Sequence, residues 1–132
     1  MNKKILKLEV NGPVQVDIYR GKDYVGHAYL IHPDMIAARA RYFPGNPYEQ
    51  NYYAKIQLFN PKYEATRKIN QFYVHNKFDP RTLQQNAAVV KTDQPFDVFY
   101  KDEQSGFRSH FTHNELKFLQ AIGEKYRGNY KC

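Results

Sequence analysis

The residues best suited to chemistry lie in the last third of the chain. Arg108 and His110 stand two apart, and His113 and Glu115 follow shortly after. A histidine with a carboxylate can transfer protons or bind a metal. However, His110 is expected on a strand and His113 at a helix start, so no shared element aims both rings at one point. We expect structural or surface roles for His110 and His113.

Arg108 and His110 have a second interpretation as a phosphate site. Residues two apart on a strand share a face, so the two side chains could bind a phosphate together. A polar solvent-facing surface is the alternative. His110-Phe111-Thr112 also resembles the His-x-Thr signature of the two-histidine phosphoesterases. That family needs two copies, and the second is missing, so a phosphoesterase or small nucleotide-binding protein is the least favoured function.

Other motifs of catalysis and cofactor binding are missing from the sequence. It has no Gly-Lys-Ser/Thr phosphate loop, nucleophile elbow, zinc-hydrolase motif or calcium loop. The only cysteine is Cys132, so neither an intramolecular disulfide nor a thiolate metal cluster can form. We therefore predict no catalytic residues, no metal and no cofactor, and a binding protein in preference to an enzyme.

Compartment and membrane association follow from cysteine use and hydropathy. A single cysteine favours a reducing, cytoplasmic location. The basic N-terminus resembles the start of a leader, but Lys7 and Glu9 interrupt any apolar stretch. No apolar run approaches the ~20 residues of a membrane helix. We expect a soluble intracellular protein without a membrane partner.

Strands are predicted wherever apolar residues alternate with polar ones. This pattern covers residues 6–10, 14–18, 24–31 and 52–59. The first two segments flank Asn11-Gly12 and predict a hairpin, and the third completes a meander. A further hairpin is predicted from residues 96–101 and 107–111.

Helices are predicted after three cap-and-proline signatures. His32-Pro33-Asp34 predicts a helix to about Tyr42, Asn60-Pro61 one to about Phe72, and Asp79-Pro80 one to about Ala88. Val89-Val90 extends the last helix or forms a short strand. Thr112-His113-Asn114-Glu115 is a capping box, and it predicts a helix ended by Gly128. Its inner residues are Leu116, Leu119, Ile122 and Tyr126.

These elements predict one α+β domain over residues 1–132. Antiparallel hairpins and a β-meander would pack against about three to four helices in a single pair of layers. A chain of 132 residues can bury one core without staples.

Charge is concentrated in the middle of the chain. Residues 39–81 hold eight Lys/Arg and three Asp/Glu, so they carry +5 of the net charge of +7. Tyrosine and phenylalanine interleave with these cations. Single-stranded nucleic acid binders use such mixtures, since cations follow phosphates while rings stack on bases. The alternative is that the rings form the core and the cations lie on solvent faces.

The leading hypothesis is therefore a small, basic, non-catalytic module that binds nucleic acid or a nucleoprotein. The residues predicted to bind nucleic acid or a partner are Arg39, Arg41, Tyr48, Tyr52, Tyr53, Lys62, Arg67, Lys68, Arg108 and His110. The alternative is a protein-interaction role, as a phage-like inhibitor of a host enzyme or a structural subunit, because Tyr and Arg are also favoured at interface hot spots. In that case the partner is another protein or a second copy of the chain.

Overall fold

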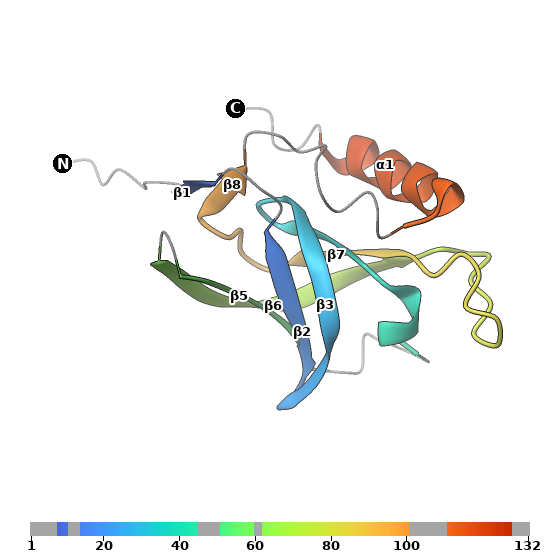
Figure 1. Ribbon diagram of the computed structural model, residues 1–132, viewed down its shortest axis with the longest axis horizontal. Coiled ribbons are helices and arrows are strands. Elements are labelled where there is room, and N and C mark those ends of the chain that lie inside the picture. The colour runs from blue at the N-terminus through green and yellow to red at the C-terminus, as the bar shows by residue number, and fades with distance from the viewer. Residues whose placement is uncertain (1–7, 11–13, 45–50, 60–61, 101–110, 128–132) are drawn as a thin grey trace.

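The chain folds as a β-barrel, with one α-helix among the residues that the structure describes, as seen in a computed structural model (Figure 1). The structure describes residues 8–10, 14–44, 51–59, 62–100 and 111–127. In chain order the elements are β1 (Leu8–Val10), β2 (Gln15–Arg20), β3 (Asp23–His32), β4 (Met35–Ala38), the 3-10 helix η1 (Ala40–Tyr42), β5 (Tyr52–Phe59), β6 (Lys62–Val74), β7 (Ala88–Thr92), β8 (Val98–Tyr100) and α1 (His113–Arg127).

Six strands close into an antiparallel barrel in the order β2-β3-β4-β7-β6-β5, with β5 pairing back onto β2. Alternation explains which side chains point inward. On β2, Val16 and Ile18 are fully buried, and on β5 the same holds for Tyr52, Ala54 and Ile56. Closure satisfies both edges of each strand, so the barrel interior is the main core.

Helix α1 packs against the outer face of β4 and β7. Met35, Ala37 and Val89 face the helix, where they meet Leu119, while the residues alternating with them face the barrel interior. All four residues of β4 are consequently buried. The prediction of α1 from the capping box is confirmed, and Leu119 is buried with Leu116 and Ile122 packed around it.

The predicted α+β class with three to four helices is wrong, because three expected helices are absent from the described residues. Residues 33–42 form β4 and η1, and residues 62–74 form the long strand β6. β4 is buried on both faces, so its apolar run lacks alternation and resembles a helix. β6 does alternate in exposure, and this tertiary pattern overrides the proline signature before it.

In place of the third expected helix, over residues 80–88, the chain forms hydrogen-bonded turns before β7. The Asp79 carboxylate accepts a hydrogen bond from the Arg81 N–H at 2.9 Å, as the cap signature predicts. Leu83 and Gln85 then adopt positive φ angles of 60° and 55°, which stop a helix. The chain continues directly into β7, so Val89-Val90 belongs to a strand.

Strand pairing differs from prediction at the start of the chain. β2 and β3 are paired as expected. The predicted bounds of β3 and β5 agree with the structure to within one residue. β1 instead pairs with β8 in parallel, so the predicted hairpin of the first two strands is wrong. The partner strand expected at residues 107–111 lies almost wholly outside the described residues. None of the helices in the described ranges is long and apolar enough to cross a membrane.

Candidate functional site

The short helix η1 is fixed by the buried side-chain amide of Asn86, two residues before β7. The backbone N–H of Arg41 donates to the Asn86 side-chain oxygen at 2.9 Å, and Asn86 is buried. Arg39 donates to the Asn86 carbonyl at 3.4 Å. Because residues from two distant parts of the chain share these bonds, η1 is held rigidly against the barrel.

Glu115 connects this arrangement to α1. Its buried carboxylate accepts hydrogen bonds from the N–H of Asn86 at 2.7 Å and of Thr112 at 3.0 Å, and it pairs with Arg39 at 3.4 Å. Thr112 in return accepts a bond from the Glu115 N–H at 3.2 Å, which completes the predicted capping box. The acid singled out beside His113 as a potential metal ligand is therefore a structural link. Among the described residues no group of three His, Cys, Asp or Glu could hold a metal ion.

Tyr42 fixes the other end of η1. Its hydroxyl donates to the His27 carbonyl at 2.7 Å, and its own carbonyl accepts a bond from the Tyr52 hydroxyl at 3.0 Å. Its ring lies so close to β3 that a Cβ on Gly26 would stand 2.5 Å from it. Burial raises the pKa of the Tyr42 phenol, although nearby Arg41 and Arg39 lower it. Tyr42 is therefore a neutral hydrogen-bond donor.

A cavity of about 180 Å³ lies beside η1, between the outer face of β3 and Phe111, which is two residues before α1. We call it the η1 cavity. The Arg39 guanidinium stands 4.3 Å from the centre of the Phe111 ring, and that of Arg41 4.9 Å from the centre of the Tyr42 ring. His27 is exposed and adds a third nitrogen-bearing side chain. The lining residues are His27, Ala28, Tyr29, Ala38, Arg39, Arg41, Tyr42 and Phe111.

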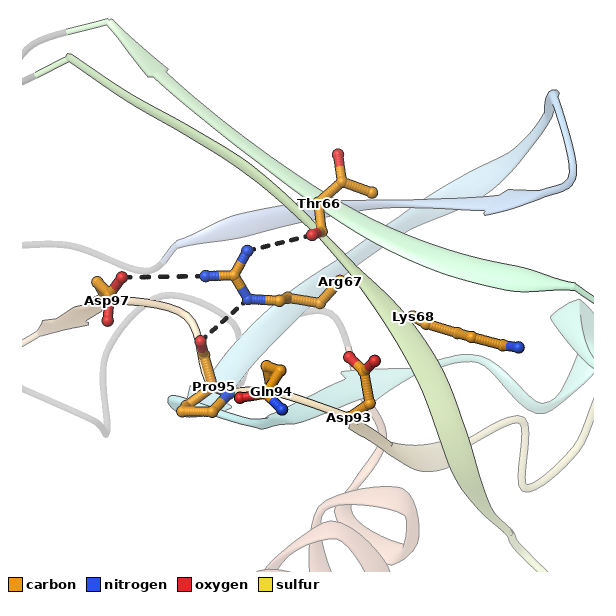
Figure 2. Close-up of a pocket in the computed structure, with 7 residues that line it drawn as sticks. All are labelled: Thr66, Arg67, Lys68, Asp93, Gln94, Pro95 and Asp97. Carbon is orange, nitrogen blue, oxygen red and sulfur yellow. Dashed lines mark hydrogen bonds and ion pairs between the residues drawn. The ribbon is translucent and has the colours of Figure 1, made fainter.

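A larger hollow of about 480 Å³ lies where β6 separates from the segment after β7. Figure 2 shows Arg67 reaching across it, with Lys68 pointing away. Arg67 donates to the carbonyls of Pro95 and Thr66, both at 3.1 Å, and pairs with Asp97 at 3.9 Å. We call this the Arg67 hollow. The Arg67 guanidinium is therefore bound by groups of the protein itself.

The structure divides the predicted binding residues between these two places and the core. Arg39 and Arg41 line the η1 cavity, while Arg67 and Lys68 line the Arg67 hollow. Tyr52 is fully buried in the barrel, so it cannot be a surface ring. Lys62 and Tyr53 lie outside both sites, on β6 and β5. Tyr48, Arg108 and His110 lie outside the described residues.

Sequence reasoning missed several residues of the η1 cavity. Strand alternation does place His27 and Tyr29 together on the outer face of β3, and this signal could have grouped them. Their rings meet edge to face with centroids 5.9 Å apart. Asn86 and Phe111 reach the site through contacts between distant parts of the chain, for which the sequence carries no local signal.

Comparison with solved structures identifies the barrel as one found in serine proteases. Kallikrein-related peptidase 10 is similar with a TM-score of 0.51 and 21% identity, over 64% of this chain and 37% of that one. A structure of that peptidase in complex with Zn²⁺ gives 0.51 and 22%, over 63% and 37%. Neuropsin, a serine protease expressed in the limbic system of mouse brain, gives 0.54 and 12%, over 66% and 41%.

These likenesses establish the fold only, and the chain spans about two fifths of the proteases' length. No family model and no curated protein matches. The hypothesis of a non-catalytic nucleic-acid-binding module is nevertheless wrong, since the barrel's neighbours are serine proteases. Nothing found supports the phage-like inhibitor either. The described members of the basic segment do not line one hollow: Arg39 and Arg41 lie at the η1 cavity, Arg67 and Lys68 at the Arg67 hollow, and Lys62 at neither.

Proposed function

We propose that this chain is a serine-protease-type barrel that acts on polypeptides and receives them at the η1 cavity. The observation that carries the proposal is the closed six-stranded barrel, which resembles those of serine proteases over about two thirds of this chain. The cavity supports the location, since it combines aromatic walls with several fixed polar groups. In this proposal the protein partner is the polypeptide substrate.

Hydrolysis of serine-protease type needs a serine nucleophile, a histidine base and a carboxylate that orients the base. The chain's serines, Ser105 and Ser109, lie outside the described residues. His27 lines the η1 cavity, and the β2–β3 ladder sets Asp17 directly opposite it. Side chains opposite each other in such a ladder lie close enough to interact. We assign His27 the role of base in any cleavage by this chain.

The test measures binding and cleavage of a polypeptide separately. Fluorescein-labelled, unfolded casein is titrated with the protein for anisotropy, and the release of acid-soluble fragments is followed over time. The proposal predicts saturable binding and slow release. In His27→Gln, binding should persist while release falls at least about 100-fold, the usual contribution of a general base. His113→Gln, which changes an exposed histidine outside the cavity, is the matched control and should behave as wild type.

Absence of casein binding would contradict the proposed function. Equal release by wild type and His27→Gln would remove the role of His27 alone.

A second candidate function is polypeptide binding without cleavage. Arg39 and Arg41 at the cavity favour it, because a guanidinium keeps its proton and cannot serve as a base. Under this alternative wild type binds casein saturably and releases no fragments. A fluorophosphonate probe, which reacts with activated serines, separates the two candidates: it labels the chain under the first and leaves it unlabelled under the second.

A further inference from the structure

The η1 cavity contains a cation whose charge the described part of the chain does not neutralise. Arg39 is paired with the buried Glu115, whereas no described carboxylate forms an ion pair with Arg41. The Arg41 guanidinium lies over the Tyr42 ring at 4.9 Å, and this contact leaves its N–H groups available at the edge. Arg41 is thus held in place, and no carboxylate in the described ranges compensates its charge.

The groups around Arg41 favour an anion. Arg39 contributes a second guanidinium, which is paired with Glu115, and His27 an imidazole, and both side chains line the cavity. The phenol of Tyr42 is neutral, because burial raises its pKa. Among the described residues that line the cavity none is acidic. The charge of Arg41 therefore favours an anion at the cavity, even with the Asp17 carboxylate opposite His27 and Glu115 paired with Arg39, and the net charge of +7 would attract an anion to the protein.

The size of the cavity limits what the anion can be. A volume of about 180 Å³ corresponds to roughly six water molecules in the liquid. Pockets for drug-sized ligands and cofactors occupy about 300–1,000 Å³. A carboxylate on a short aliphatic chain fits, and its planar pair of oxygens matches the donor fork of a guanidinium.

We propose that the η1 cavity binds a carboxylate of the polypeptide, with Arg41 as its principal contact. The inference rests on the proposed function and narrows its substrate class to acidic polypeptides. Two sources can supply this group, the side chain of an acidic residue and the C-terminal carboxylate of the peptide. Phe111 and Tyr29 form apolar walls for the aliphatic part of the ligand.

Arg41 can be tested without disturbing the fold. Its side chain is exposed, and the bond that fixes η1 to Asn86 uses its backbone N–H, which alanine retains. Arg81 provides a matched control, since its side chain is 90% exposed and lies outside the η1 cavity. Arg41→Ala and Arg81→Ala therefore remove the same charge from exposed positions.

The experiment measures the dissociation constants of labelled short peptides by anisotropy. One carries a central glutamate between blocked ends, a second replaces it by glutamine, and a third has the glutamine with a free C-terminal carboxylate. We expect the glutamate or the free-carboxylate peptide to bind at least tenfold more tightly than the blocked glutamine peptide. Whichever does so identifies the source of the carboxylate.

Arg41→Ala should remove this tenfold preference, and Arg81→Ala should change it less than twofold. Unchanged thermal unfolding and circular dichroism of both variants establish that they fold. Equal binding of all three peptides by wild type would overturn the inference, and so would equal effects of the two variants. Casein binding separates failure of the proposed function from failure of the carboxylate inference. If casein binds while the peptides show no preference, only the carboxylate inference fails.

Discussion

Two hollows lined by arginine differ in what the fold does with the positive charge. In the Arg67 hollow the guanidinium is surrounded by the carbonyls of Thr66 and Pro95, the Asp97 carboxylate and the Phe96 ring, at 5.2 Å from its centre. It bridges β6 and the segment after β7, where their ladder ends (Figure 2). In the η1 cavity Arg41 has an aromatic support and no described acid.

The volumes of these two hollows are a poor guide to which of them could bind a ligand. The Arg67 hollow is more than twice as large, at about 480 against 180 Å³, but its arginine is bound by the carbonyls of Thr66 and Pro95 and by Asp97. In the smaller cavity, Asn86 holds the backbone of Arg41 and Glu115 holds the side chain of Arg39. A cation that a fold uses for itself stabilises the protein, whereas one that it holds without compensation is available to a ligand.

The largest effect should come from removing the support of the η1 cavity. Glu115→Ala leaves the Asn86 N–H and the Arg39 charge without their buried acceptor, and we expect a loss of about 3 kcal/mol or more in the free energy of unfolding. Urea denaturation measures this. The exposed Glu64, which pairs with Lys55, supplies the control Glu64→Ala, with an expected change below about 0.5 kcal/mol. Similar losses in the two variants would contradict a stabilising role of Glu115 beneath the η1 cavity.

The close approach of Tyr42 to β3 should rank second. Gly26→Ala forces a methyl group into the Tyr42 ring, and overpacking of this kind costs about 1–3 kcal/mol. In a Tyr42→Ala background the same change should be nearly neutral, since the clash is gone. A double-mutant cycle on unfolding free energies measures the coupling. Additive losses would contradict the contact that shapes this wall of the cavity.

Arg67 should behave oppositely to Arg41. Arg67→Ala removes two interactions across the split, with Pro95 and Asp97, and one with its neighbour Thr66, and we expect a loss of about 1–2 kcal/mol in stability. Peptide affinity should stay within twofold of wild type. Thermal unfolding and peptide anisotropy on the same samples give both quantities. Reduced peptide binding with full stability would reverse the roles of the two hollows.

The smallest effect concerns Asp34, whose carbonyl accepts a bond from Thr92 just before the Arg67 hollow. Burial raises the pKa of its carboxyl, although Lys91 lowers it. The folded state thus holds this proton more strongly than the unfolded state. The resulting stability is complete below the ordinary aspartate pKa of about 3.9 and is lost as the pH rises through the raised folded value.

Asparagine at this position cannot titrate, so Asp34→Asn should gain melting temperature relative to wild type as the pH is raised from about 3 to 7. Asp93→Asn, at an exposed site, is the control and should show no such trend. A constant difference between Asp34→Asn and wild type across this range would contradict the raised pKa.

Alternation predicted three barrel strands in which one face is buried and the other exposed, whereas β6 also alternates and was expected to be a helix because of Asn60-Pro61 before it. β2, β3 and β5 alternate clearly, and the capping box at Thr112 and Glu115 predicted α1. β4 is buried on both faces because α1 covers its outside, so the fold class was missed at that point. Alternation describes a strand's own surroundings and cannot reveal that another element lies over it.

The site was predicted in part. Arg39 and Arg41 were selected for their charge, but so was Arg67, and only the contacts of each arginine separate them. The bond between Arg41 and Asn86 joins residues 45 positions apart. Such a contact forms only when the barrel is closed, so no local sequence pattern predicts it.

The most direct test of the account maps where an acidic peptide binds. Backbone amide chemical shifts are recorded while the glutamate peptide is added to wild-type protein. We expect the largest shifts around the η1 cavity, at residues 27–29 and 38–42, with the amides of residues 66–68, 93–94 and 96–97 unaffected. Shifts confined to the Arg67 hollow, or spread evenly over the basic surface, would contradict it.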